Sequence, residues 1–132
     1  HEVIEEALKL TWPLARYADI TINKVFEESM PLIKASREEL LEIFAFIIIN
    51  SFSVMVKEGT LTIKTGYLKG EDAIKIIISD TAKTDVEKRI MDLTPVRKLI
   101  SGRNGSFDAK REAEGATCTV RIPSIWQNSS AL

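Results

Sequence analysis

Histidine and cysteine are nearly absent from this chain of 132 residues, which contains one of each. We interpret His1, at the very start, as the remnant of a purification tag or the edge of a longer protein. With His1 set aside, no histidine remains for a catalytic triad or for accepting a phosphoryl group. A lone Cys118 excludes an internal disulfide and cannot by itself form a zinc site.

Long apolar runs are missing as well. The longest, Ile43 to Ile49, is far shorter than the roughly 18 residues of a membrane-spanning helix, and no signal-peptide pattern is present. The net charge is only −1, and no aromatic residues alternate with the basic ones. We therefore expect no nucleic-acid partner and no contact of this domain with a membrane.

Helical and strand-like periodicities alternate in the first part of the sequence. The pattern predicts a helix over residues 2–18, which Pro13 should bend or divide. A strand follows at residues 20–26, and residues 32–34 predict another short strand. These elements are the beginning of a mixed α/β chain.

A second helix is the most strongly marked element. Ser36 should cap it, because Glu39 stands three residues on in a capping-box pattern. The helix is expected to run to about Met55. Residues 44–49 are apolar on almost every side, which indicates a buried helix.

The rest of the sequence alternates in strand pairs separated by turns. Residues 60–67 and 73–78 predict a hairpin, and Pro95 interrupts a stretch of helix formers over 85–101. A final strand pair is expected at 107–111 and 117–122. We predict an α/β fold, a two-layer α/β sandwich with a mixed, mostly antiparallel sheet and helices packed on one face. It forms one domain over residues 1–126, with a frayed tail at 127–132.

An ordered set of motifs lies on these elements. The buried helix contains Asn50, a hairpin follows it, and the next apolar strand ends at Asp80. A short helix at 96–100 and a closing hairpin that includes 115–123 complete the set. The order resembles the ATP-binding catalytic domain of sensor histidine kinases, a fold shared with gyrase and Hsp90. The resemblance covers nearly the whole chain.

The resemblance implies a nucleotide site with ATP and Mg²⁺ as its cofactors. Asn50 would supply an oxygen ligand to Mg²⁺, and Asp80 would accept a hydrogen bond from adenine. Ala82, Thr84 and Thr117 fall at further nucleotide-binding positions. Two simpler interpretations stay open: Asn50 as a buried amide satisfied by the backbone, and Asp80 as a turn-forming residue at the end of a strand.

This chain departs from the family pattern at several of those positions. Ala82 and Thr84 replace the two glycines that let the backbone pass close to the base. Phe46 stands one turn before Asn50, where the family often has a polar or acidic residue. The 15 residues between Asp80 and Val96 contain no glycine for a phosphate-binding lid.

Further departures add to these. Asp92 would place a negative charge near the triphosphate, and Ala116 replaces a threonine that often supports the aspartate. The losses together favour a pseudokinase-like domain of a two-component signalling protein that is impaired in nucleotide binding and serves as a docking module. We expect it to be inactive as an isolated phosphotransferase, and to need no cofactor.

The partners expected from the resemblance are phosphoacceptor and dimerisation helices upstream in a cytoplasmic parent protein, and a response regulator. Two alternatives remain. The domain could bind ATP and Mg²⁺ and phosphorylate a histidine elsewhere in its parent. Alternatively, large side chains such as Phe46 could fill the space beside Asp80 and leave a structural spacer.

Overall fold

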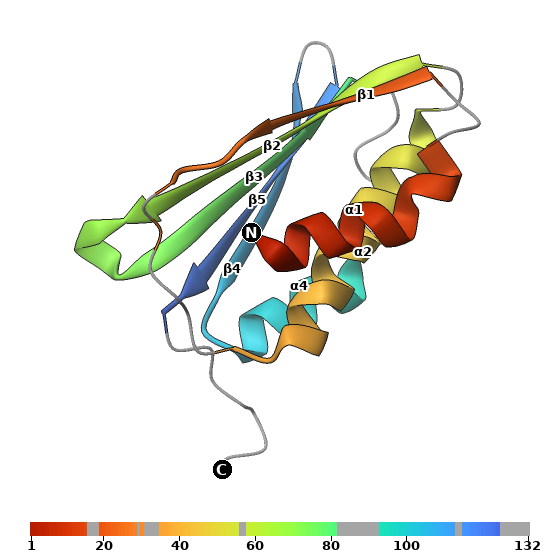
Figure 1. Ribbon diagram of the computed structural model, residues 1–132. Coiled ribbons are helices and arrows are strands. Elements are labelled where there is room, and N and C mark those ends of the chain that lie inside the picture. The colour runs from red at the N-terminus through yellow and green to blue at the C-terminus, as the bar shows by residue number, and fades with distance from the viewer. Residues whose placement is uncertain are drawn as a thin grey trace.

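Five strands form one sheet, and the described helices lie together on one face of it (Figure 1). The computed structural model describes residues 1–15, 19–28, 30, 35–55, 58–81, 93–112 and 115–124. The helices are α1 (Glu2–Ala15), α2 (Arg37–Val54) and α4 (Thr94–Gly102). The strands are β1 (Asp19–Val25), β2 (Glu58–Leu68), β3 (Ala73–Asp80), β4 (Ser106–Glu112) and β5 (Gly115–Pro123), and a 3₁₀ turn, η1 (Lys69–Glu71), joins β2 to β3.

The order of the strands in the sheet is β1-β2-β3-β5-β4. Only β1 and β2 run parallel among these pairs, and the other neighbours are antiparallel. The predicted two-layer sandwich with a mostly antiparallel sheet is confirmed. The short strand expected at residues 32–34 and the tail at 127–132 lie outside the described residues.

Of the two effects expected of Pro13, bending or dividing the first helix, the structure excludes division. The helix continues to Ala15 with Pro13 inside it. The proline lies in the last turn, so the missing N–H removes a hydrogen bond only near the end of the helix. Pro95 is the second residue of α4 and lies in its first turn, where a backbone N–H would have no partner within the helix.

The α2 helix begins as its cap predicts. The Ser36 hydroxyl accepts a hydrogen bond from the backbone N–H of Glu39 at 3.3 Å. Its inward face packs on the sheet, and Ile43, Ile47 and Ile48 are almost completely buried. The core between the helices and the sheet also contains Leu61, Ile63, Ile76, Val120 and Ile122.

The expectation that α2 is buried on almost every side is wrong for its outward face. Phe46 and Ile49 keep 38% and 41% of their surface exposed. The reason is the single layer of helices: α2 packs against the sheet and along α1 (Figure 1), which leaves one side of the helix outside these contacts. Among the described residues, no helix has the length and hydropathy to cross a membrane.

His1 makes contacts within the fold. Its ring stacks on Phe26 with 4.5 Å between centroids, and Nε2 is hydrogen-bonded to the Thr65 hydroxyl at 2.8 Å. The first residue therefore packs on the segment after β1 and on β2, a structural role that the sequence interpretation did not assign to it.

The turn between β2 and β3 is held by a polar cluster around Asp72. This residue has a left-handed backbone conformation, with φ of 48°. Its carboxylate accepts hydrogen bonds from the Tyr67 hydroxyl at 2.9 Å and from the Ser124 hydroxyl at 2.7 Å. The Ser124 bond, followed by the Tyr67 bond, lowers the pKa of Asp72 below its ordinary value of 3.8.

Asp72→Asn should therefore have a pH-dependent effect on stability. Asparagine tolerates the left-handed conformation but removes the charge. Because the folded pKa is the lower one, the carboxylate stabilises the fold above pH 3.8 and loses this contribution as pH falls through the folded pKa. Urea unfolding should show that the variant is less stable than the unmutated domain at pH 7. At about pH 3 the difference in the free energy of unfolding should be smaller. An equal gap at both pH values would contradict this.

Candidate functional site

The end of β3 places a carboxylate inside the fold. Asp80 is the last residue of β3 and is 7% exposed. In the sheet it lies between Leu61 of β2 and Ala116 of β5. The burial pattern along β3 puts Asp80 on the same face as Ile76 and Ile78, which is the face covered by the helices. A buried carboxylate needs partners, and Asp80 has an interaction within the fold.

Gly115 lies directly against the backbone of Asp80. It has a φ of 142°, which L side chains rarely adopt. A Cβ atom at Gly115 would lie 1.8 Å from the carbonyl oxygen of Asp80 and 2.9 Å from Cα of Thr81. The glycine that this site requires is therefore on the neighbouring strand β5.

Thr81 connects the end of β3 to both layers of the fold. Its hydroxyl oxygen accepts a hydrogen bond from the Thr60 backbone N–H at 3.0 Å and lies 3.9 Å from the Met55 sulfur. Gly59 makes room for this contact, because a Cβ there would come within 2.4 Å of that sulfur. The sequence interpretation missed these roles of Thr81, Met55 and Gly59. A hydroxyl residue at a strand end was the one available signal.

The contact between Met55 and Thr81 brings the end of α2 to the end of β3. Asn50 precedes Met55 by five residues in the sequence, which corresponds to about 7.5 Å along a helix axis. Asn50 is 9% exposed and has an interaction within the fold. Both predicted polar residues, Asn50 and Asp80, thus belong to the same end of the domain.

Phe46 does not act as a buried filler of the interior. It precedes Asn50 by one helical turn, with 38% of its surface exposed. Ile49, on the same outward side of α2, is 41% exposed. Where the resemblance would place a polar or acidic group, the helix therefore presents a partly exposed aromatic ring.

Thr117 lies on the opposite face of the sheet from Asp80. It pairs with Ser79 across β3 and β5, and the two hydroxyl oxygens are 3.2 Å apart. Since side chains alternate along a strand, the hydroxyls of Ser79 and Thr117 project away from the helices. The nucleotide-binding role of Thr117 stays a prediction, and this placement does not favour it.

The remaining predicted positions contribute no described geometry. Ala82, Thr84 and Asp92 lie outside the described residues. Within the part of the chain that the structure describes, no group of three or more histidine, cysteine, aspartate or glutamate residues could hold a metal ion. Binding of Mg²⁺ near Asn50 would therefore depend on oxygen ligands from bound phosphates.

Two hollows that are lined by described residues lie away from Asp80 and Asn50. One of about 480 Å³ has an apolar floor that includes Phe44, Ile76 and Ile122, beside the first turns of α1 and α2. Another, of about 490 Å³, lies between α1 and β1 beside Trp12. Asp80 and Asn50 line neither of them.

Solved structures of sensor histidine kinases share this architecture. The nucleotide-free catalytic domain of histidine kinase ThkA is 15% identical, with a TM-score of 0.82 over 94% of this chain and 91% of that chain. Histidine kinase AdeS of Acinetobacter baumannii is 17% identical, with a TM-score of 0.78 over 96% of this chain and 64% of that one. Histidine kinase ThkA in complex with response regulator protein TrrA is 15% identical, with a TM-score of 0.80 over 99% and 41%.

These comparisons establish the fold, which is that of the histidine kinase catalytic domain. At such low identities the likeness does not extend to the chemistry of the site. No protein-family model matches the sequence, and no curated protein matches it.

Gly115→Ala should severely destabilise the site and the fold. The new Cβ would meet backbone atoms of Asp80, which cannot move aside as a flexible side chain could. We expect a loss of more than about 2 kcal/mol in the free energy of unfolding, measured with urea. Gly70→Ala is the matched control, because nothing lies within 4 Å of its Cβ position; it should change stability by less than about 0.5 kcal/mol. Similar losses in both variants would disprove the close approach.

Proposed function

We propose that this domain, which has the fold of histidine kinase catalytic domains, serves a two-component signalling protein as a docking module with impaired nucleotide binding. In this proposal its parent is a cytoplasmic protein whose phosphoacceptor and dimerisation helices lie upstream. Its docking partner is a response regulator. The likeness to a histidine kinase solved with its response regulator supports this choice of partner.

The observation that carries the proposal is the outward face of α2. Near Asn50, the outward side of this helix exposes two apolar side chains, those of Phe46 and Ile49. An aromatic ring can neither ligate Mg²⁺ nor act as a base. Partly exposed aromatic and aliphatic side chains on a rigid helix are, in contrast, the usual anchors of protein interfaces.

The chemistry of the residues near Asp80 supports weak nucleotide binding. The carboxylate is retained and could accept a hydrogen bond from adenine, but Ala82 and Thr84 add side chains where the family has glycines. No described cluster of acidic residues assists Asn50 in holding a cation. A triphosphate needs several positive or N–H groups around it, and the sequence from 82 to 92 contains no glycine to present backbone N–H groups closely.

Calorimetric titration with ATP and Mg²⁺ tests the proposal. We expect no measurable binding, since the base would meet added side chains and the phosphates would lack a lid. A dissociation constant below about 100 μM, or about −5.5 kcal/mol, would contradict impaired binding. The catalytic domain of a nucleotide-binding histidine kinase, titrated in parallel, is the positive control.

A second function is favoured by the buried Asp80 itself. In this alternative, the domain binds ATP and Mg²⁺ through Asp80 and Asn50 and phosphorylates a histidine in its parent protein. Asp80→Asn retains the size of the side chain but replaces a hydrogen-bond acceptor with a donor amide.

The full-length parent protein, incubated with radiolabelled ATP, decides between the two. We expect no autophosphorylation in either the parent or its Asp80→Asn variant. Phosphorylation that is present in the parent and reduced at least about tenfold in the variant would establish the enzymatic alternative. Gly70→Ala serves as a control for expression and folding.

A further inference from the structure

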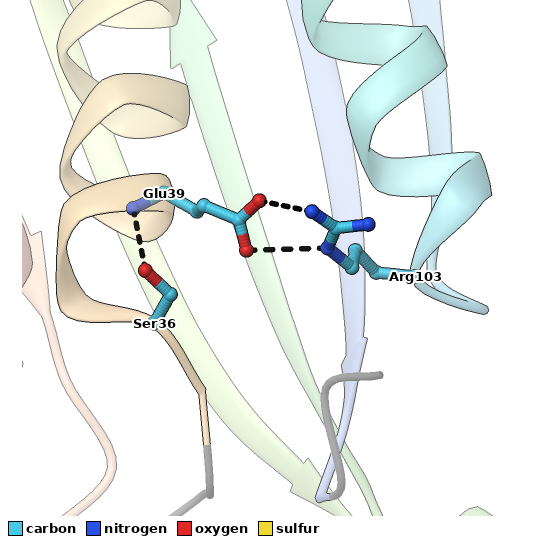
Figure 2. A network of polar contacts seen from close by, with 3 residues as sticks. All are labelled: Ser36, Glu39 and Arg103. Carbon is cyan, nitrogen blue, oxygen red and sulfur yellow. Dashed lines mark hydrogen bonds and ion pairs between the residues drawn. The ribbon is translucent and has the colours of Figure 1, made fainter. Parts of the chain in front are cut away.

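The first turn of α2 forms ion pairs with residues on two sides of it. On one side, Arg37 forms an ion pair with Glu6 of α1 at 2.5 Å. On the other, the carboxylate of Glu39 binds the guanidinium group of Arg103 at the end of α4 (Figure 2). Arg103 Nε donates to Glu39 Oε1 at 3.2 Å, and Arg103 Nη2 donates to Oε2. This turn of α2 therefore joins all three described helices.

The two ion pairs differ in exposure. The side chains of Arg103 and Glu39 are 11% and 24% exposed, whereas those of Arg37 and Glu6 are 55% and 41% exposed. Solvent and salt screen exposed pairs strongly. A bidentate arginine–carboxylate pair has a fixed geometry, and when it is mostly buried, solvent and salt screen its attraction less. The hydrogen bonds from Arg103 to Glu39 also raise the pKa of the guanidinium, which stays charged.

The α4 helix has a second polar attachment, to the sheet. Arg97 Nη1 donates to the carbonyl oxygen of Phe107 in β4 at 3.2 Å, and its guanidinium carbon lies 4.9 Å from the centre of the Phe107 ring. The side chains of Val96 and Ile100, which also belong to α4, are buried. Arg97 thus holds α4 to β4, while Arg103 holds the end of α4 to α2.

We propose that Glu39 and Arg103 form a latch that positions α4 relative to α2. Breaking the latch would leave α4 held to the sheet by Arg97 and its buried residues, but free to shift against the helix layer. The latch holds the C-terminal end of α4, because Arg103 directly follows Gly102, the last residue of that helix.

Distances between spin labels on α2 and α4 test the latch in the folded chain. The labels are placed by Glu42→Cys and Lys98→Cys, both exposed positions, with the native Cys118 replaced by alanine. We expect one narrow distance distribution in this labelled domain without further substitutions. Glu39→Gln, which keeps the shape but removes the charge, should broaden it about twofold. The exchanged pair Glu39→Arg with Arg103→Glu should restore the narrow distribution.

The matched control is Arg37→Gln, which breaks the exposed pair with Glu6 and should leave the distribution unchanged. Circular dichroism melting establishes that each variant is folded. An unchanged distribution in folded Glu39→Gln would overturn the latch, as would broadening that the exchanged pair fails to reverse. The measurement uses neither nucleotide nor partner, so its failure would leave the proposed function standing. Tight ATP binding, in turn, would remove the proposed function without affecting the latch.

Discussion

The burial of α2 against the sheet is the contact on which the rest of the domain depends. Ile43, Ile47 and Ile48 are almost fully removed from solvent, and each such side chain contributes about 1.5–3 kcal/mol. A single hydrogen bond contributes about 1 kcal/mol, so the apolar contact dominates. The first turn of α2 then binds α1 and α4, and its last residues bring Met55 to Thr81.

This arrangement separates the residues that hold the fold together from those on the outward side of α2. The inward side of α2 is constrained by packing, and the position of Asp80 by its place in the sheet between β2 and β5. The outward side is free of both constraints. The residue types at Phe46 and Ile49 can therefore vary without disturbing the core. One side of α2 is held by the core, and apolar side chains are exposed on the outward side. Such a helix is suited to binding another protein.

Local features of this domain could be predicted from the sequence, and distant contacts could not. The start of α2 follows from Ser36 and its capping pattern, and the placement of Asp80 follows from the apolar alternation before it. Glu39 and Arg103 are 64 residues apart, so only the folded arrangement of α2 and α4 brings them together. The exposure of Phe46 was equally hidden, because an apolar run does not reveal which side of its helix a second layer covers.

The most direct test of the account follows backbone amide resonances of the ¹⁵N-labelled domain by NMR. The receiver domain of the proposed response-regulator partner is added to one sample, and ATP with Mg²⁺ at about 1 mM is added to a second sample. The account predicts that the receiver domain shifts resonances around Phe46 and Ile49 on α2, while nucleotide leaves those of Asn50 and Asp80 unchanged. Shifts at Asn50 and Asp80 on addition of nucleotide, with none on α2 from the receiver domain, would contradict it.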